Sequence, residues 1–256
     1  MVKVGAKKKN LKKRGRKFRL WFKPSWKMSF EQYVTFYYKL DLRVVEKLRR
    51  LTAEGKPNKR FEFMAKYYKK LVSPESDVVD HAGLVEGLRK LNLPANSKVV
   101  SYGAGDMYHE CFLLKDFPQI SSMIGVEPLE AMRRLTGKIA FNILGIKKRK
   151  KIKTVSGLFE DSIKIPANSA EAIITNEAFH HVKNPEIALR NMASKLKPNG
   201  GMVIVYRPDY KTKPPNPIQL GLILRKVGLR VIVTKPLRKN EAELNNNLHL
   251  IVAKKD

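Results

Sequence analysis

The chain has 256 residues and a single cysteine, Cys111. One cysteine cannot form an internal disulfide framework, and it cannot build a cysteine-based structural zinc site. This scarcity is typical of a reducing compartment, so we expect a cytoplasmic location and no bound metal. Long apolar runs are also missing: no segment approaches the ~20 residues that a membrane-spanning helix needs. We therefore expect no membrane span. Since no apolar h-region lies near the start of the chain, we also expect no secretory signal.

Acidic residues are scarce as well. Asp and Glu total 23 against 52 Lys and Arg, which gives a formal net charge of +29. Such an excess attracts polyanions, because binding releases their condensed counterions. RNA, DNA and anionic membranes are the candidate partners. A generally lysine-rich proteome, for example a thermophilic one, is the alternative explanation, but the basic residues are clustered rather than evenly spread.

The first cluster lies at the start of the chain, where residues 1–30 hold twelve basic residues and no acid. Apolar residues are too sparse from Met1 to Gly15 to bury a face, so we expect this part to be disordered when alone. Aromatic residues then alternate with the cations, and they can stack on unpaired bases while the cations contact phosphates. A mitochondrial transit peptide is the rival reading, although it would be richer in Arg and Ser. Two further basic stretches are GIKKRKKIK (residues 145–153) and YKTKPPNP (residues 210–217). The RNA-binding candidates, taken from the first two of the three stretches, are Lys7, Lys8, Lys9, Lys12, Lys13, Arg14, Arg16, Lys17, Arg19, Trp21, Lys147, Lys148, Arg149 and Lys150.

Three segments follow from these patterns: a basic arm over 1–28, basic helices over 29–80 and one domain over 81–256. We expect SPESD (residues 73–77) to be a loop, followed by a helix that ends before Pro94. From Lys98 onward, short apolar runs alternate with amphipathic runs, which is typical of βαβ units on a parallel sheet. The predicted strands are Lys98–Tyr102, Met123–Val126, Lys153–Ser156, Ala172–Thr175, Met202–Tyr206, Leu229–Thr234 and Leu248–Ala253.

The sequence VVSYGAGD places glycines where the first predicted strand ends and a helix begins. Glycine lets the backbone approach a ligand closely, and the helix N-terminus offers N–H groups to it. Glu127, in MIGVEP, stands at the end of the second strand, where an acid can accept both hydroxyls of a ribose. The loop and the distant acid together indicate a site for a nucleotide-like cofactor.

Two further stretches carry a resemblance to a known family. They are PANSAEAI before the fourth strand and NEAFHHVKNPEIALRNMASKLKPNGGMVIV after it. With the glycine loop, they resemble the class I S-adenosylmethionine-dependent methyltransferases of the type 11 group, over roughly residues 84–253. The resemblance implies an α/β fold: a doubly wound, mostly parallel, seven-stranded Rossmann-like sheet with its last strand antiparallel, here preceded by N-terminal helices.

The resemblance also implies S-adenosylmethionine as cofactor and gives site residues by their place in the motifs. The glycine loop would line the methionine and ribose, Glu127 would bind the ribose, and Glu160 or Asp161 would read the adenine amine. Asn176 would face the methionine end, with His180 and His181 as catalytic candidates near the methyl group. The full cofactor set is Tyr102, Gly103, Ala104, Gly105, Glu127, Pro128, Glu160, Asp161 and Asn176.

The chain departs from the family pattern at two positions of the loop. Ser101 replaces the acid that is usual two residues before the first glycine, and Met107 stands where a third glycine is common. We expect Ser101 to remove a charged partner of the cofactor's amino group and Met107 to narrow the loop. The two adjacent histidines either act as base or merely fill a turn. They would point oppositely on an extended segment, which disfavours metal binding.

Three functions remain open. The first is a methyltransferase acting on ribosomal or transfer RNA, with ribosomal RNA as the favoured partner. The second is an inactive protein of the same fold, bound to ribosomal RNA as a structural or assembly component. The third is a small-molecule methyltransferase whose basic segment touches anionic membrane. Arg207, after the fifth strand, is equally compatible with a phosphate contact and with a solvated side chain.

Overall fold

The computed structural model describes residues 74–161, 163–208, 214–237 and 248–256. The predicted arm and almost all of the predicted basic helices lie outside these residues. The first described helix, α5 (Pro74–Leu91), begins inside the predicted loop, so the loop prediction is wrong for residues 74–77. Proline is compatible with a first helical turn, because the N–H that it lacks has no helical partner there.

One seven-stranded sheet organises the described chain, in the order β3-β2-β1-β4-β5-β7-β6. Among these strands, β7 runs antiparallel to both of its neighbours and the rest are parallel to one another. This confirms the predicted α/β class and the antiparallel last strand. The bounds are β1 Ser97–Tyr102, β2 Ile120–Val126, β3 Ile152–Val155, β4 Ala170–Asn176, β5 Leu196–Tyr206, β6 Leu229–Leu237 and β7 Leu248–Lys255.

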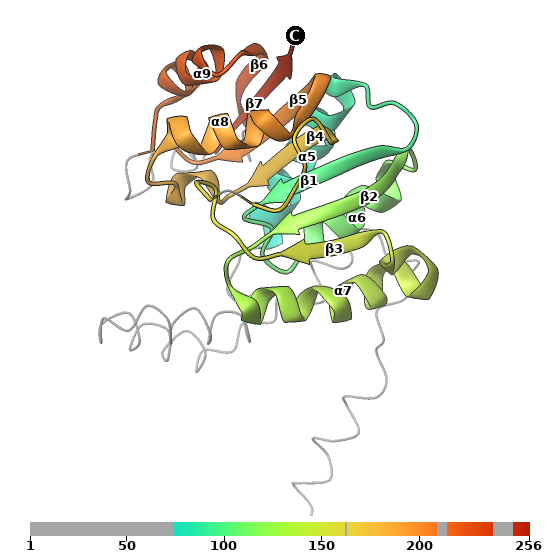
Figure 1. Cartoon of the computed structure of the whole chain (residues 1–256). Helices are drawn as coiled ribbons and strands as arrows, with labels where there is room; N and C mark the ends of the chain where they lie inside the picture. The colour runs from blue at the N-terminus through green and yellow to red at the C-terminus, as the bar shows by residue number, and fades with distance from the viewer. Residues whose placement is uncertain (1–73, 162, 209–213, 238–247) are drawn as a thin grey trace, which may run out of the picture.

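Helices cover both faces of the sheet (Figure 1). α5 packs on one face with α6 (Tyr108–Asp116) and α7 (Glu130–Arg149). The other face carries α8 (Pro185–Lys195) and α9 (Pro217–Lys226). Both of the latter begin at a proline after an asparagine whose side chain accepts a backbone N–H of the first turn. None of the described helices is long and apolar enough to cross a membrane.

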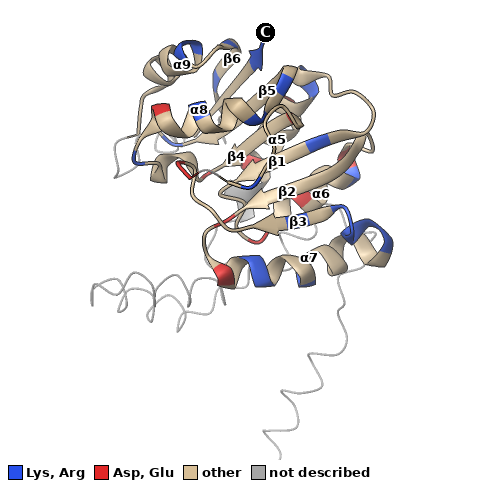
Figure 2. Ribbon diagram, viewed as in Figure 1, with Lys and Arg blue, Asp and Glu red and all other residues tan. Residues whose placement is uncertain are grey.

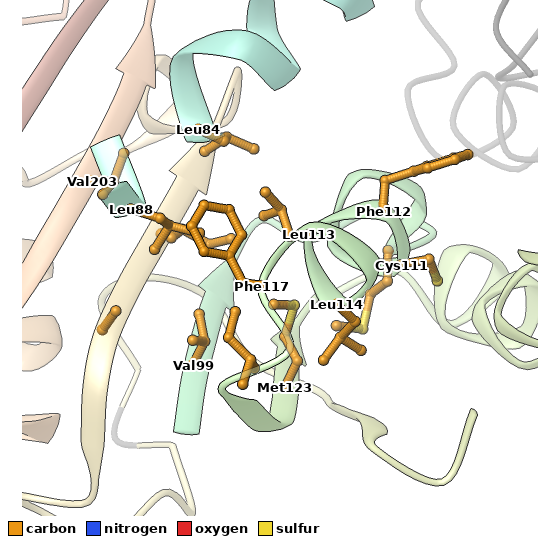
Figure 3. Close-up of a cluster of buried hydrophobic side chains, with 14 of the residues drawn as sticks. Leu84, Leu88, Val99, Cys111, Phe112, Leu113, Leu114, Phe117, Met123 and Val203 are labelled. Atoms are coloured by element: carbon orange, nitrogen blue, oxygen red, sulfur yellow. The ribbon is translucent and has the colours of Figure 1, made fainter. Parts of the chain in front are cut away.

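The cluster under α5 and α6 is apolar and fully buried (Figure 3). Leu84 and Leu88 of α5 meet Val203 of β5 and Leu113 of α6 there. Cys111 is also buried in this cluster, as expected of a packing residue rather than a nucleophile.

Helix α5 lies close to β5 and runs antiparallel to it. A Cβ at Gly83 would lie 3.2 Å from Val205, and one at Gly87 would lie 2.3 Å from Val203. Later residues of the helix therefore lie beside earlier residues of the strand, and the N-terminal end of α5 lies at the carboxyl end of β5. This is the edge where ligands bind in open α/β sheets.

Candidate cofactor site

The loop after β1 is held in a glycine-dependent conformation. Gly103 and Gly105 have φ of 66° and 54°, values that side-chain-bearing residues rarely adopt. The N–H groups of Gly103 and Ala104 both donate to the carbonyl of Val126, at 2.9 and 3.1 Å. The end of β2 thus fixes the loop against the end of β1.

Two neighbouring loops approach Gly103 closely. A Cβ on this residue would lie 2.2 Å from the Cβ of Ala178, which follows β4, and 3.3 Å from the ring of Phe159, which follows β3. A distance of 2.2 Å cannot be accommodated without moving one backbone. The ends of β1, β3 and β4 therefore converge at this glycine.

Glu127 faces the same loop from the end of β2. Its Oε2 accepts the N–H of Gly105 at 2.9 Å and its Oε1 accepts the N–H of Leu129 at 2.9 Å. The side chain is buried, and this burial is the main reason why its pKa is raised, although both hydrogen bonds and Arg133 oppose the shift. Arg133 also donates to the carbonyls of Glu127 and Pro128, at 2.6 and 2.7 Å.

Sequence reasoning missed Glu110, the third residue of α6. The hydroxyl of Ser101 donates to its Oε1 at 2.5 Å, and both side chains are buried. Desolvation raises the pKa of Glu110 to about 7; the bond from Ser101 opposes this, and the charges of Asp106 and Glu127 add to it. The serine that breaks the family pattern is therefore in contact with a carboxyl group from another element. The only sign of this contact in the sequence is an acid seven residues after the first glycine of the loop.

Several buried polar atoms at the ends of β1 and β4 have no hydrogen-bond partner among the described residues. They are the hydroxyls of Tyr102 and Thr175 and the Oδ1 of Asn176. Tyr102 and Thr175 are register partners and lie side by side on the adjacent parallel strands β1 and β4. Buried polar groups normally find partners, so this group of atoms is suited to a polar ligand. The Tyr102 ring itself packs against Phe159 at 5.6 Å between centroids, and burial raises its pKa to about 12.

The two histidines do not lie on an extended segment, so that expectation is wrong. They belong to one 3₁₀ turn, η2 (Phe179–His181), and their ring centroids are 4.2 Å apart. Burial is the largest cause that lowers the pKa of His180, to about 3, and His181 and Arg207 add to the effect. His180 is therefore neutral near pH 7. No group of three metal-ligating side chains occurs among the residues that the structure describes.

Arg207 is partly exposed and is engaged in an ion pair. It pairs with Glu177 at 2.7 Å, so the loops after β4 and β5 are joined by an ion pair. The backbone of Glu177 has φ of 49° and its N–H donates to Val205. This contact positions the residue that follows Asn176.

The two acids after β3 are engaged by backbone groups. Glu160 accepts the N–H groups of Lys183 and Asn184 at 2.8 and 3.2 Å, which ties its loop to the start of α8. Asp161 accepts the N–H of Leu158 at 2.7 Å and closes its own turn. A role for either acid toward an adenine amine stays a prediction.

Met107 does not narrow the loop as expected. It adopts φ of 59°, and its side chain is fully buried against Gly125 of β2, where a Cβ would lie 2.4 Å from its sulfur. The side chain therefore fills the core beneath the loop. A glycine on β2 compensates for the absence of one in the loop.

The second predicted RNA-binding cluster lies far from this loop. Lys147, Lys148, Arg149 and Lys150 are all exposed at the end of α7. Figure 2 shows basic residues at the end of α7 where β3 starts and an acidic residue at its other end, where Glu130 begins the helix. The candidates from Lys7 to Trp21 lie outside the described residues.

A model of the methyltransferase domain family matches residues 59–247. The chain belongs to this methyltransferase domain family. No curated protein matches it in sequence.

Solved methyltransferase structures resemble the domain closely enough to establish its fold. An S-adenosylmethionine-dependent methyltransferase from Mesorhizobium loti has a TM-score of 0.55 at 15% identity, covering 69% of this chain and 100% of that one. One from Aquifex aeolicus has a TM-score of 0.51 at 20% identity, covering 66% and 87%. A methyltransferase bound to the Trm112 activator in Haloferax volcanii has a TM-score of 0.54 at 14% identity, covering 67% and 87%.

S-adenosylmethionine is the cofactor that fits this methyltransferase domain. Its sulfonium and ammonium groups are cationic, and the loop is surrounded by the buried acids Asp106, Glu110 and Glu127 in a chain of net charge +29. The partnerless polar atoms at the ends of β1 and β4 suit its amino-acid and ribose groups.

Proposed function

We propose that this protein transfers a methyl group from S-adenosylmethionine to RNA, with ribosomal RNA as the favoured substrate and the cytoplasm as its location. The observation that carries the proposal is the separation of charge along the sheet. Buried acids surround the glycine loop at one edge, and a run of exposed cations lies at the other. The first arrangement suits a cationic cofactor and the second a polyanion.

The cofactor would lie against the backbone of Gly103–Gly105. Glu127 would accept its ribose hydroxyls, since each carboxylate oxygen keeps a lone pair beyond its present hydrogen bond. Asn176 would face the methionine end with its partnerless Oδ1. When bound, S-adenosylmethionine supplies an activated methyl group on a positively charged sulfur.

The residues of the chain then have to hold the acceptor in line and exclude water. Alignment of this kind accounts for much of the rate that a transfer reaction gains from an enzyme. His180 is a poor proton acceptor near pH 7, because its pKa lies near 3. Its proposed part is to fix the loop after β4. His181, exposed in the same turn, is the better candidate for contact with an acceptor.

The RNA part of the proposal rests on charge and geometry. The twelve basic residues of 1–30 and the cluster at 147–150 both lack acidic neighbours in sequence. The regular part of helix α7 runs from Glu130 to Leu144, because the backbone of Gly145 is not helical, and it separates that cluster from the glycine loop. At 1.5 Å per residue this part is about 22 Å long. An RNA that contacts both regions is therefore an extended or folded molecule.

One observation favours each of the two alternative functions, a non-catalytic RNA-binding protein and a small-molecule methyltransferase. The contact of Ala178 with Gly103 leaves little room beside the loop, which favours a non-catalytic RNA-binding protein. An open groove of about 530 Å³ between the starts of α8 and α9 has a largely apolar lining, including Val182, Leu222 and Ile223, which favours a small-molecule acceptor. The buried acids at one edge of the sheet and the exposed cations at the other favour the RNA methyltransferase over both alternatives.

Methyl transfer from tritiated S-adenosylmethionine separates the three. The full chain is incubated with total RNA and with total lipid extract, both from a strain that lacks the protein. We expect label in RNA that ribonuclease releases. Label in lipid alone would favour the small-molecule reading. No label in either, together with retained RNA binding, would favour the non-catalytic one.

A further inference from the structure

Glu110 is a buried acid that the predicted site does not use. Glu110 exposes only 3% of its surface to solvent, and its Oε1 accepts a hydrogen bond from the hydroxyl of Ser101 at 2.5 Å. The other oxygen, Oε2, has no hydrogen-bond partner among the described residues. No described cation forms an ion pair with it. A carboxyl group in this state is costly to the fold, so its presence needs an explanation.

The local backbone explains how the side chain reaches this place. Met107 precedes α6 in a left-handed conformation, and its buried side chain anchors the start of the helix. Glu110 lies in the first turn of α6, and its side chain reaches Ser101 near the end of β1. It arrives beside Ser101, the residue that replaces the acid of the family pattern.

We propose that Glu110 supplies the carboxylate that pairs with the α-ammonium group of the cofactor, and that Ser101 positions it. In the family pattern this acid stands at the end of the first strand, whereas in this chain it stands on α6, the helix after the loop. This inference rests on the proposed function, because it assumes that the loop binds S-adenosylmethionine or its product.

Electrostatics supports a ligand-supplied cation. Asp106 and Glu127 lie near enough to Glu110 to repel its negative form, and both are themselves buried. A cationic group between the three acids would relieve this repulsion. The structural alternative is that Glu110 and Ser101 only satisfy each other in the core, in which case no ligand depends on the charge.

Two ligands distinguish these roles: S-adenosylhomocysteine and its deamino analogue, which lacks only the ammonium group. Titration calorimetry on the full chain should show that the wild type binds the former more tightly. In Glu110→Gln, affinity for S-adenosylhomocysteine should fall about 10- to 100-fold, the range for a lost charged hydrogen bond. Affinity for the deamino analogue should change less than about twofold, so the discrimination disappears.

Further variants keep the test independent of folding. Ser101→Ala, which keeps the acid but not its hydrogen bond, should show a smaller loss of the same kind. The double variant Ser101→Asp with Glu110→Gln should regain discrimination. Glu130→Gln, at an exposed acid paired with Arg134, is the matched control and should change nothing.

The outcomes separate this inference from the proposed function. If the wild type binds S-adenosylhomocysteine but Glu110→Gln weakens both ligands equally, or neither, the role toward the ammonium is overturned and the cofactor site stands. If the wild type binds neither ligand, the proposed function itself fails, and the inference fails with it.

Discussion

The two edges of the sheet differ in the sign and the burial of their charges. At the carboxyl ends of the parallel strands, Asp106, Glu110 and Glu127 are buried around a glycine loop. At the opposite edge, the cations of residues 147–150 are exposed. Buried charges interact strongly with a nearby charged group, because solvent and salt screen them little, whereas exposed charges act on large polyanions and are screened by salt. One edge is therefore suited to a small cation and the other to nucleic acid.

The glycine loop offers the largest expected effect. Gly103→Ala adds a Cβ in a left-handed conformation, 2.2 Å from Ala178. The loop must shift, and misplacing reacting groups by about 1 Å costs about 100-fold in rate. We expect a loss of about that size in the rate of methyl transfer, together with weaker binding of S-adenosylmethionine by calorimetry.

Gly137→Ala is the control for that change, since a Cβ there meets nothing within 4 Å. It should leave cofactor affinity unchanged and favour α7 by about 1 kcal/mol. If Gly103→Ala folds and binds S-adenosylmethionine as the wild type does, the acidic edge is not the cofactor site. The comparison between the edges then loses its basis.

Charge reversal at the other edge should give an intermediate effect. Lys147→Glu with Lys148→Glu should weaken RNA binding about tenfold at low salt and reduce the slope of log K against log salt by about 2. Cofactor affinity should not change. Filter binding at several salt concentrations measures both quantities.

Arg89→Glu with Lys90→Glu changes net charge by the same amount at exposed residues near the end of α5. It should affect RNA binding less than the α7 pair does. Equal losses in the two double variants would mean that only net charge matters, and that the cluster on α7 is no specific contact.

A separate prediction concerns how the stability of the fold depends on pH. The pKa of Glu110 is raised from 4.5 to about 7 in the folded chain, so the folded state holds a proton that the unfolded state has lost between these values. The free energy of unfolding should therefore fall as pH rises from 4.5 to 7, by up to about 3 kcal/mol. Glu110→Gln should lack this decrease, as measured by denaturant unfolding across that range.

His180 acts in the opposite direction, since its lowered pKa makes the fold lose stability as pH falls below 6.5. The difference between wild type and Glu110→Gln removes this common contribution. A difference that does not vary with pH would show that Glu110 titrates normally and is not desolvated.

The fold was predictable because its signals are local. Alternating apolar runs predict the seven strands, and the glycines before Met107 with Glu127 at the next strand end predict the loop. The start of α5 could not be predicted, because a proline in SPESD is compatible with both a turn and a first helical turn. The sequence gives no sign of which side chains meet across elements. The contacts of Ser101 with Glu110 and of Glu177 with Arg207 join residues whose proximity only the packing decides.

The most direct test of the central claim is calorimetric titration of S-adenosylmethionine into the full chain and into Glu127→Gln. The account predicts saturable binding at one site per chain in the wild type. It predicts about 10- to 100-fold weaker binding in the variant, since a carboxylate accepts two ribose hydroxyls and an amide does so poorly. Absence of binding by the wild type, or equal affinity in the two proteins, would contradict it.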